Sequence, residues 1–265
     1  MKQRFLTPCV ILLFSCIGLA STALTSETTP LTGRDIMVLV DDLPDGEDRV
    51  SEVHLTLVNR RGRERVREMI SWRKDEGPDT KKLMRFRKPS DVKGTAFLSW
   101  DYDNPEQEDD RWLYMPALRN TRRISGKAND DYFMGTDFTY DDMGDRNVDE
   151  DTHTLVREET IGDALCWVVE STPVDPSDMY IKTVNWIDQK TKLALKKEYY
   201  DKDGLLKTYT TDAFEMIDGF WTITAMRMEN HAENHKTLMG FKKIRYNTGL
   251  RENRFKVNAL ARKTR

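Results

Sequence analysis

A regular alternation of apolar and polar residues is the feature that most constrains what this chain can fold into. Val53, Leu55 and Leu57 alternate with His54 and Thr56, and a period of two recurs over most of the sequence beyond residue 50. Side chains two positions apart lie on one face of a β-strand. The pattern predicts strands near residues 50–59, 64–74, 81–88, 94–101, 111–118, 153–160, 165–173, 180–188, 193–201, 205–216, 220–230 and 237–246.

The connections between these strands are short and rich in turn-forming residues. Examples are residues 59–62 (NRRG), 188–191 (DQKT), 201–204 (DKDG) and 218–219 (DG). They are too short to hold a crossover helix, so consecutive strands must be antiparallel neighbours. A sheet of about ten strands curls or closes. We therefore expect a mainly β fold, a curved antiparallel sheet that forms a half-open barrel.

One helix is expected before the first strand. Thr32 is a candidate N-cap and Asp35 stands at the third helical position, which is a capping-box arrangement. An apolar stripe follows, and Leu43 and Pro44 mark the end of the helix. This N-terminal helix and a central irregular segment, residues 102–151, are expected to cover the concave face of the sheet.

The central segment has an uneven distribution of charge. Residues 101–110 (DYDNPEQEDD) are acidic, a basic group follows, and residues 130–151 hold nine acids against one arginine, Arg146. Opposite charges so close in sequence can neutralise one another. We interpret residues 102–151 as a charged loop insertion that is solvated and held by surface ion pairs. The alternative is a docking surface for another protein of the cell envelope.

The first residues have the pattern of a secretory signal. Lys2 and Arg4 precede an apolar run, residues 9–20 (CVILLFSCIGLA), and the small residues 21–23 (STA) suit a signal peptidase. The apolar run is about half of the roughly 20 residues needed to span a bilayer. We predict a signal peptide at 1–23 and a single periplasmic β domain at 24–265. A lipid anchor on Cys16 is the less favoured alternative, because the bulky Phe14 precedes it.

Charge and cysteine content argue against a nucleic-acid partner and against an intramolecular disulfide. Lys and Arg number 42 and Asp and Glu 45, a net charge of −3. Nucleic-acid binders usually show a basic excess, so no nucleic-acid partner is expected. Removal of the signal peptide would leave Cys166 as the single cysteine, and therefore no intramolecular disulfide. Its apolar neighbours predict a buried structural thiol.

The sequence shows no clear catalytic motif. It contains no nucleophile elbow, phosphate-binding glycine loop or dinucleotide fingerprint. We predict a protein that is not an enzyme and that uses no cofactor or metal. The less favoured alternative is a metal-dependent hydrolase, because His231, Glu233 and His235 would share one face of a strand and carboxylates cluster at 137–142. Acidic residues at 145–151 have calcium-loop spacing but lack its glycine.

A curled sheet with aromatic residues on an apolar face could enclose a ligand. We predict a hydrophobic cavity whose lining is drawn from Ile70, Trp72, Trp112, Tyr114, Trp167, Val169 and Trp221. The alternative is that these residues are simply core, because large aromatic side chains dominate the packing of any β protein. Periodicity identifies residues that share a face, but not which face is inside.

Three segments resemble a known family, the outer-membrane lipoprotein-sorting-like (LolA-like) proteins. They are residues 112–118 (WLYMPAL), 122–124 (RRI) and 135–143 (GTDFTYDDM), and the resemblance extends over about 33–262. It implies a periplasmic half-open barrel around helices, with an apolar cavity for acyl chains. It further implies a role in lipoprotein or lipid trafficking, with an RND-type exporter or an outer-membrane receptor as partner. The alternative function is a scaffold protein with a filled cavity.

Overall fold

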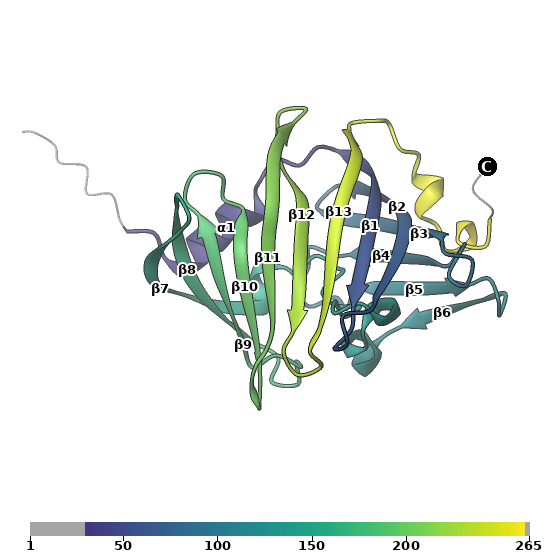
Figure 1. The fold of residues 1–265 in the computed structure, drawn as a ribbon. Helices are drawn as coiled ribbons and strands as arrows, with labels where there is room; N and C mark the ends of the chain where they lie inside the picture. The colour runs from purple at the N-terminus through teal and green to yellow at the C-terminus, as the bar shows by residue number, and fades with distance from the viewer. Residues whose placement is uncertain (1–29, 263–265) are drawn as a thin grey trace, which may run out of the picture. The chain divides into compact units, whose positions relative to one another are not determined.

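The computed structural model describes residues 30–262, and the predicted signal peptide and Cys16 lie outside this range. Thirteen strands form one antiparallel sheet in the order β6-β5-β4-β3-β2-β1-β13-β12-β11-β10-β9-β8-β7 (Figure 1). The strands are β1 (Asp48–Val58), β2 (Glu64–Glu76), β3 (Asp79–Lys88), β4 (Ala96–Asp101), β5 (Asp110–Met115), β6 (Asn120–Ile124), β7 (Asp151–Ile161), β8 (Ala164–Pro173), β9 (Lys182–Asp188), β10 (Ala194–Asp201), β11 (Gly204–Ile217), β12 (Phe220–Asn230) and β13 (His235–Tyr246).

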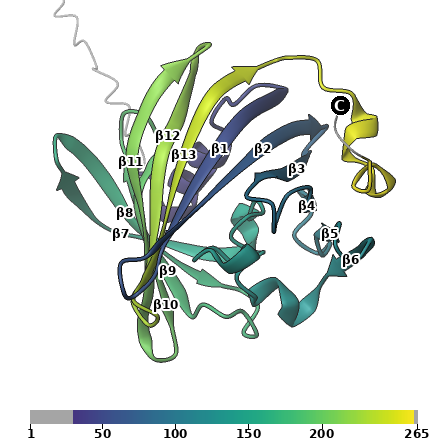
Figure 2. The same cartoon turned by 45° about the vertical axis from the view of Figure 1, so that its right-hand side comes forward.

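This sheet confirms the predicted mainly β, antiparallel fold. Each of the twelve predicted strands corresponds to one strand of the structure. The additional strand is β6, in the stretch that we interpreted as part of the charged loop. Its sequence, NTRRI, has a single apolar residue, and so gives no alternating signal. Figure 2 shows that the sheet is strongly curved, with β3 to β6 turning away from the broad surface formed by β11 to β2.

The helix α1 (Gly33–Asp41) has the predicted capping box, since Thr32 Oγ1 accepts a hydrogen bond from Asp35 N–H and Asp35 accepts one from Thr32 N–H. It packs on β7 and β8 through Ile36, which is fully buried. A Cβ atom at Gly33 would come within 2.7 Å of the β7 backbone, so only glycine allows this close contact. Among the described residues, no helix has both the length and the apolar character needed to cross a membrane.

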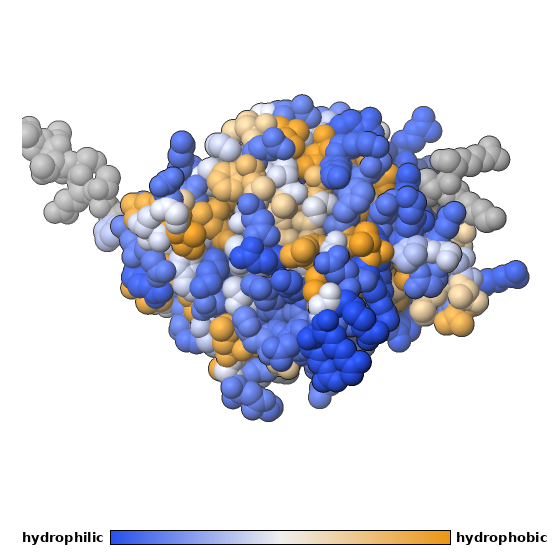
Figure 3. Space-filling model, viewed as in Figure 1, coloured by the Kyte–Doolittle hydropathy of each residue, from blue (hydrophilic) through white to orange (hydrophobic). Residues whose placement is uncertain are grey.

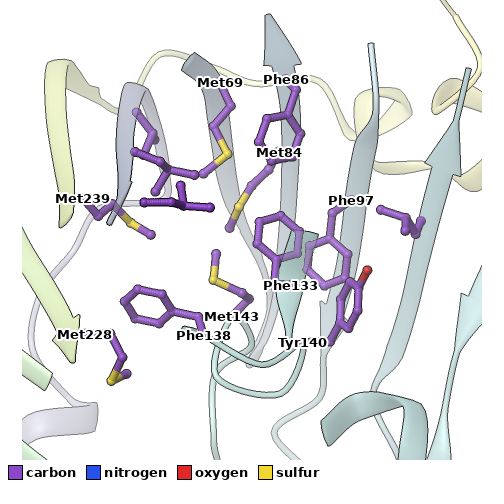
Figure 4. Packing of buried hydrophobic residues seen from close by; sticks show 14 of the residues in the cluster. Met69, Met84, Phe86, Phe97, Phe133, Phe138, Tyr140, Met143, Met228 and Met239 are labelled. Carbon is purple, nitrogen blue, oxygen red and sulfur yellow. The ribbon is translucent and has the colours of Figure 1, made fainter. Parts of the chain in front are cut away.

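The connection between β6 and β7, residues 125–150, forms a plug on the concave side of the sheet. It contains three short 3-10 helices, at Gly126–Asp130, Phe133–Gly135 and Val148–Glu150. Phe133 is fully buried, with its ring 5.4 Å from Phe97 and 5.9 Å from Phe86 (Figure 4). Phe138, Tyr140 and Met143 join the same cluster. Of the segment predicted to cover the concave face, 102–151, only the part at 125–150 does so, because β5 and β6 belong to the sheet. The covering part is packed into the core and is not the solvated loop that its charge suggested.

The plug is anchored to the sheet by polar contacts as well as by apolar packing. Lys207 of β11 is fully buried, and its ammonium group binds the carboxylate of Asp142. The Tyr180 hydroxyl donates a hydrogen bond of 3.1 Å to Asp142, and the Tyr180 and Tyr199 rings each lie 4.9 Å from Lys207 Nζ. Arg67 of β2 donates to the Met134 carbonyl. One plug carboxylate therefore neutralises a buried cation of the sheet.

The C-terminal segment covers the opposite, convex face of β2 to β5. Its 3-10 helices are Glu252–Phe255 and Val257–Ala259. Phe255 and Leu260 are buried against Trp72, and the Trp100 indole donates a hydrogen bond of 2.8 Å to the Phe255 carbonyl. Both faces of this part of the sheet are therefore covered.

Candidate functional site

The concave face also contains a cavity of about 680 Å³, in the region that the plug does not fill. A ligand site usually measures roughly 300–1,000 Å³, so the cavity is large enough for a ligand. The apolar part of its wall comes mainly from α1 with the loop after it, and from β12 and β13: Met37, Val40, Leu43, Leu193, Trp221, Ile223, Met226, Phe241 and Ile244. All of these except Leu193 are only half-buried. The wall is apolar surface that no side chain of the described residues fully covers.

The opposite wall is charged and internally paired. Arg73 on β2 lies 2.7 Å from Asp45 and 2.8 Å from Asp75. Lys82 on β3 lies 3.4 Å from Asp101 and also binds Asp145 of the plug. The cavity therefore has one apolar side and one side of paired charges, which is the arrangement that suits an amphiphilic molecule.

Burial shifts the protonation of this charged wall. It raises the pKa of Asp45, of Asp75 and of Asp101 above the ordinary aspartate value, even though Arg73 or Lys82 pulls in the opposite direction. Desolvation disfavours the ionised carboxyl in each case. These carboxylates take up protons at a higher pH than exposed aspartates would, so the charge of the wall varies with pH.

Lys197 on β10 lines the cavity and, like Arg49 on β1, has no carboxylate partner within 4.0 Å among the described residues. Its ammonium group lies 4.8 Å from the Tyr199 ring, and burial lowers the pKa of Lys197. Next to it the wall is polar but neutral: Asn185 donates to Ser171 Oγ at 3.2 Å. Lys197 is thus a cation that could bind an anionic group of a ligand.

The structure distributes the seven predicted cavity residues over three clusters. Ile70, Trp72, Trp112 and Tyr114 lie together on the convex face, under the C-terminal segment. Trp167 and Val169 pack under α1, and Trp221 belongs to a third cluster. Of the seven, only Trp221 lines the cavity. The seven do not surround one common space, and a role of any of them in ligand binding stays a prediction.

The residues of the metal-site alternative contact different partners. His235 Nδ1 lies 2.7 Å from Asp137, whereas His231 Nε2 lies 2.8 Å from Thr208 Oγ1. No group of three or more metal-binding side chains converges within residues 30–262. The acids at 145–151 are bound separately: Arg34 lies 2.8 Å from Asp149, and other cations bind the rest. Cys166 is buried as predicted, and burial raises its pKa to about 11.

The charged wall is the part of the site that sequence reasoning missed. Arg73, Lys82 and Asp101 stand near the ends of strands, where charged residues are ordinarily exposed. The register pairs Arg73 directly with Lys82, and the two cations are accommodated because four acids from four different segments surround them. Two like charges directly opposite each other on neighbouring strands repel and therefore require acids nearby. The Arg73 and Lys82 pair is the one local signal that could have indicated this wall.

Comparison with known proteins shows the family and the fold. A protein-family model described as "uncharacterized protein" matches residues 78–262. A DUF1329 family protein from Desulfovibrio piger is 35% identical with a TM-score of 0.83, covering 86% of this chain and 97% of that one. A putative outer membrane lipoprotein-sorting protein domain from Vibrio parahaemolyticus is 32% identical with a TM-score of 0.82, covering 87% and 98%.

A more distant structure extends the likeness in fold. The LolA superfamily protein NE2245 from Nitrosomonas europaea is 21% identical with a TM-score of 0.68, covering 86% of this chain and 99% of that one. The fold is therefore LolA-like, as the sequence resemblance implied. Among curated proteins, no relative matches the chain.

Proposed function

The chain belongs to the DUF1329 family, and from this premise we propose that it is a periplasmic binding protein that carries an acyl-bearing amphiphile. The relative described as a putative lipoprotein-sorting protein domain supports a task in lipoprotein or lipid trafficking. An RND-type exporter or an outer-membrane receptor is the partner that we propose for loading or unloading.

The observation that carries the proposal is the half-exposed apolar wall facing a cavity of about 680 Å³. Met37 and Val40 of α1 and Ile223 of β12 present apolar surface that only a ligand could cover completely. An acyl chain that leaves water gains roughly 0.8 kcal/mol per buried methylene. A dozen methylenes would thus contribute roughly 10 kcal/mol before the costs of binding, which is enough to hold a chain in an open cavity.

The charged wall gives the ligand an orientation. The acyl chain lies against α1, β12 and β13, and the polar end of the molecule lies against the paired charges of β2 and β3. Lys197 on β10 binds an anionic group of the ligand. Of the other cavity cations, Arg73, Lys82 and Arg146 are bound to carboxylates, whereas Arg49 forms no ion pair among the described residues. The cavity supports binding, because most of its charged groups are held in ion pairs that can face the polar end of a ligand. The same cavity lining holds His153, whose Nδ1 lies 2.7 Å from Ser171 Oγ.

Uptake of cis-parinaric acid, a fluorescent fatty acid, tests the proposal. The variant Ile223→Phe places a larger side chain in the cavity, and we expect it to weaken uptake at least about tenfold, or about 1.4 kcal/mol. The matched control is Val156→Phe on β7, where the side chain is 50% exposed and lies outside the cavity lining. The control should bind like the wild type. Native mass spectrometry of protein purified from cells should show a retained lipid.

A specific observation also supports the alternative of a non-carrier scaffold. Half of the concave face is already filled by the protein itself, through Phe133, Phe138 and Tyr140 of the plug. If the wild type takes up no probe and carries no lipid from cells, the cavity is empty space in a scaffold, and the carrier proposal is wrong.

A further inference from the structure

The turn between β1 and β2 is the most concentrated basic feature on the surface. Residues 59–65 contain four arginines, Arg60, Arg61, Arg63 and Arg65, against one acid, Glu64, and all four arginines are exposed. We call residues 59–65 the arginine hairpin. Figure 3 shows a continuous, strongly hydrophilic patch where Figure 1 places the joined ends of β1 and β2. This patch carries a net charge of +3 in a chain whose overall charge is −3.

These four arginines are not neutralised by the protein. No carboxylate of residues 30–262 lies within 4.0 Å of any of their guanidinium groups, whereas seven arginines elsewhere in that range form ion pairs: Arg34, Arg73, Arg111, Arg123, Arg146, Arg157 and Arg227. Arg67, the next arginine along β2, points inward to the Met134 carbonyl and has a different role. An anion that binds here would relieve the repulsion among the four guanidinium groups.

The hairpin is held in a defined conformation. Asn59 Oδ1 accepts hydrogen bonds from the backbone N–H groups of Arg61 and Arg63, at 2.9 and 3.1 Å. Gly62 has a φ of +71°, which glycine adopts without strain, and its N–H donates to the Asn59 carbonyl at 2.8 Å. The arginines are therefore presented on a fixed turn, so little backbone order is lost on binding.

A groove of about 560 Å³ lies beside the hairpin. Arg60, Arg61 and Arg63 line one side, and Tyr132, Asn230 and His235 line the other. Tyr132 is fixed by a hydrogen bond of 2.7 Å from Asn230.

Two acids line this groove, Asp137 and Glu233, and neither lies within 4.0 Å of an arginine guanidinium group of the hairpin. Asp137 is already bound by His235 at 2.7 Å and by Thr237 at 2.7 Å. The groove thus combines guanidinium groups that have no carboxylate partner among the described residues with the partly exposed ring of Tyr132.

We propose that the arginine hairpin and its groove dock the protein on the phosphate groups of an anionic lipid surface. Arginine binds phosphate bidentately and is weakly hydrated, which suits it to a crowded layer of phosphates. Tyrosine favours the boundary between water and lipid, and Val66 beside the hairpin is 54% exposed. An acidic protein would satisfy the charges alone, but not the adjacent tyrosine and valine. This inference does not depend on what the concave cavity binds.

Flotation with lipid vesicles tests this docking surface. The full protein is mixed with vesicles of equal parts phosphatidylglycerol and phosphatidylcholine, or of phosphatidylcholine alone, at about 0.1 M salt. The wild type should float with the anionic vesicles only. The triple variant Arg60→Gln, Arg61→Gln, Arg63→Gln should bind them about 100-fold more weakly, since each basic residue near such a surface contributes about fivefold.

The matched control removes the same charge elsewhere. Arg122, Arg245 and Arg251 are exposed and form no ion pair within residues 30–262, and their triple glutamine variant should bind almost like the wild type. Unchanged melting curves of both variants show that folding is intact. Equal losses in both variants, or no flotation of the wild type, would overturn the proposal. The proposal would also be overturned if inorganic phosphate at matched ionic strength displaced the protein from the vesicles. The same holds if the protein were retained on immobilised polyglutamate but did not bind vesicles.

Discussion

The two halves of the concave face differ in what covers them. In the half formed by β1 to β5, the plug inserts Phe133, Phe138 and Tyr140, and the sheet residues below them are buried. In the half between α1 and β12, Met37 and Ile223 remain half-exposed around a cavity. The half formed by β1 to β5 is a fully packed core. The half between α1 and β12 is an apolar surface that faces a cavity. The space left open on the concave face thus depends on how far the connection between β6 and β7 extends across it.

Removal of a large aromatic side chain should give the largest difference in the free energy of unfolding between the two halves. Phe133→Ala deletes a fully buried ring that contacts Phe86, Phe97 and Tyr140, and should lower the free energy of unfolding by about 3–5 kcal/mol. Trp221→Ala in the open half deletes a half-buried ring and should cost less than half as much. Urea unfolding followed by fluorescence measures both. Equal losses would mean that the cavity wall is packed as tightly as the plug.

Enlargement of a side chain should also destabilise a packed site more than the cavity wall, but by a smaller amount. Val169→Phe overpacks a fully buried site under α1, beside Ile36 and Ile187, and should cost about 1–3 kcal/mol. Ile223→Phe projects into the cavity and should leave the melting temperature nearly unchanged. Thermal unfolding of the two variants compares them directly. A severe loss in Ile223→Phe would show that the space beside it is not available to a ligand.

The last comparison depends on pH and concerns Asp109, a partly buried acid in the loop between β4 and β5. Burial raises the pKa of Asp109 to about 7, although Arg111 lies 2.9 Å away, whereas the ordinary value is 3.8. The folded state therefore holds this proton more tightly than the unfolded chain. The stability from Asp109 is present at low pH and is lost as pH rises from about 4 to about 7, by up to ~1.4 kcal/mol per pH unit.

The variant Asp109→Asn should flatten that part of the pH profile. Urea unfolding of wild type and variant between pH 5 and pH 8 (about the range in which the group titrates) measures the difference in slope. An unchanged slope in the variant would assign the pH dependence to other buried carboxyls such as Asp101, whose pKa burial also raises.

Local patterns were sufficient to predict the elements of this fold. Alternation identifies twelve strands, and the capping residues Thr32 and Asp35 identify α1, because both signals depend on neighbours in sequence. Strand β6 was missed because its side chains are polar. Local patterns could not decide which face is concave: Met69 and Ile70 are adjacent and apolar, yet Met69 faces the plug and Ile70 faces the C-terminal segment.

The candidate site depended on contacts that are distant in sequence. Trp72 fits an inward-facing pattern, but Phe255 and Leu260 cover it from the other side of the sheet. The cavity wall joins α1 to β12, and the charged wall joins Asp45, Lys82 and Asp145. No periodicity relates these positions, and of the seven predicted lining residues only Trp221 lines this cavity.

The strand order gives the connection between β6 and β7 a mechanical role. β6 and β7 are the two edges of the sheet, on opposite sides in Figure 1, and they are consecutive in the chain. Residues 125–150 are therefore a strap that ties one rim of the open barrel to the other, where a closed barrel would have hydrogen bonds. Any widening of the barrel for a bulkier cargo must lengthen this strap. Asp142 on the strap binds the buried Lys207, so widening of the barrel would also pull these two groups apart. The aperture and the filling of the barrel are thus set by one piece of chain.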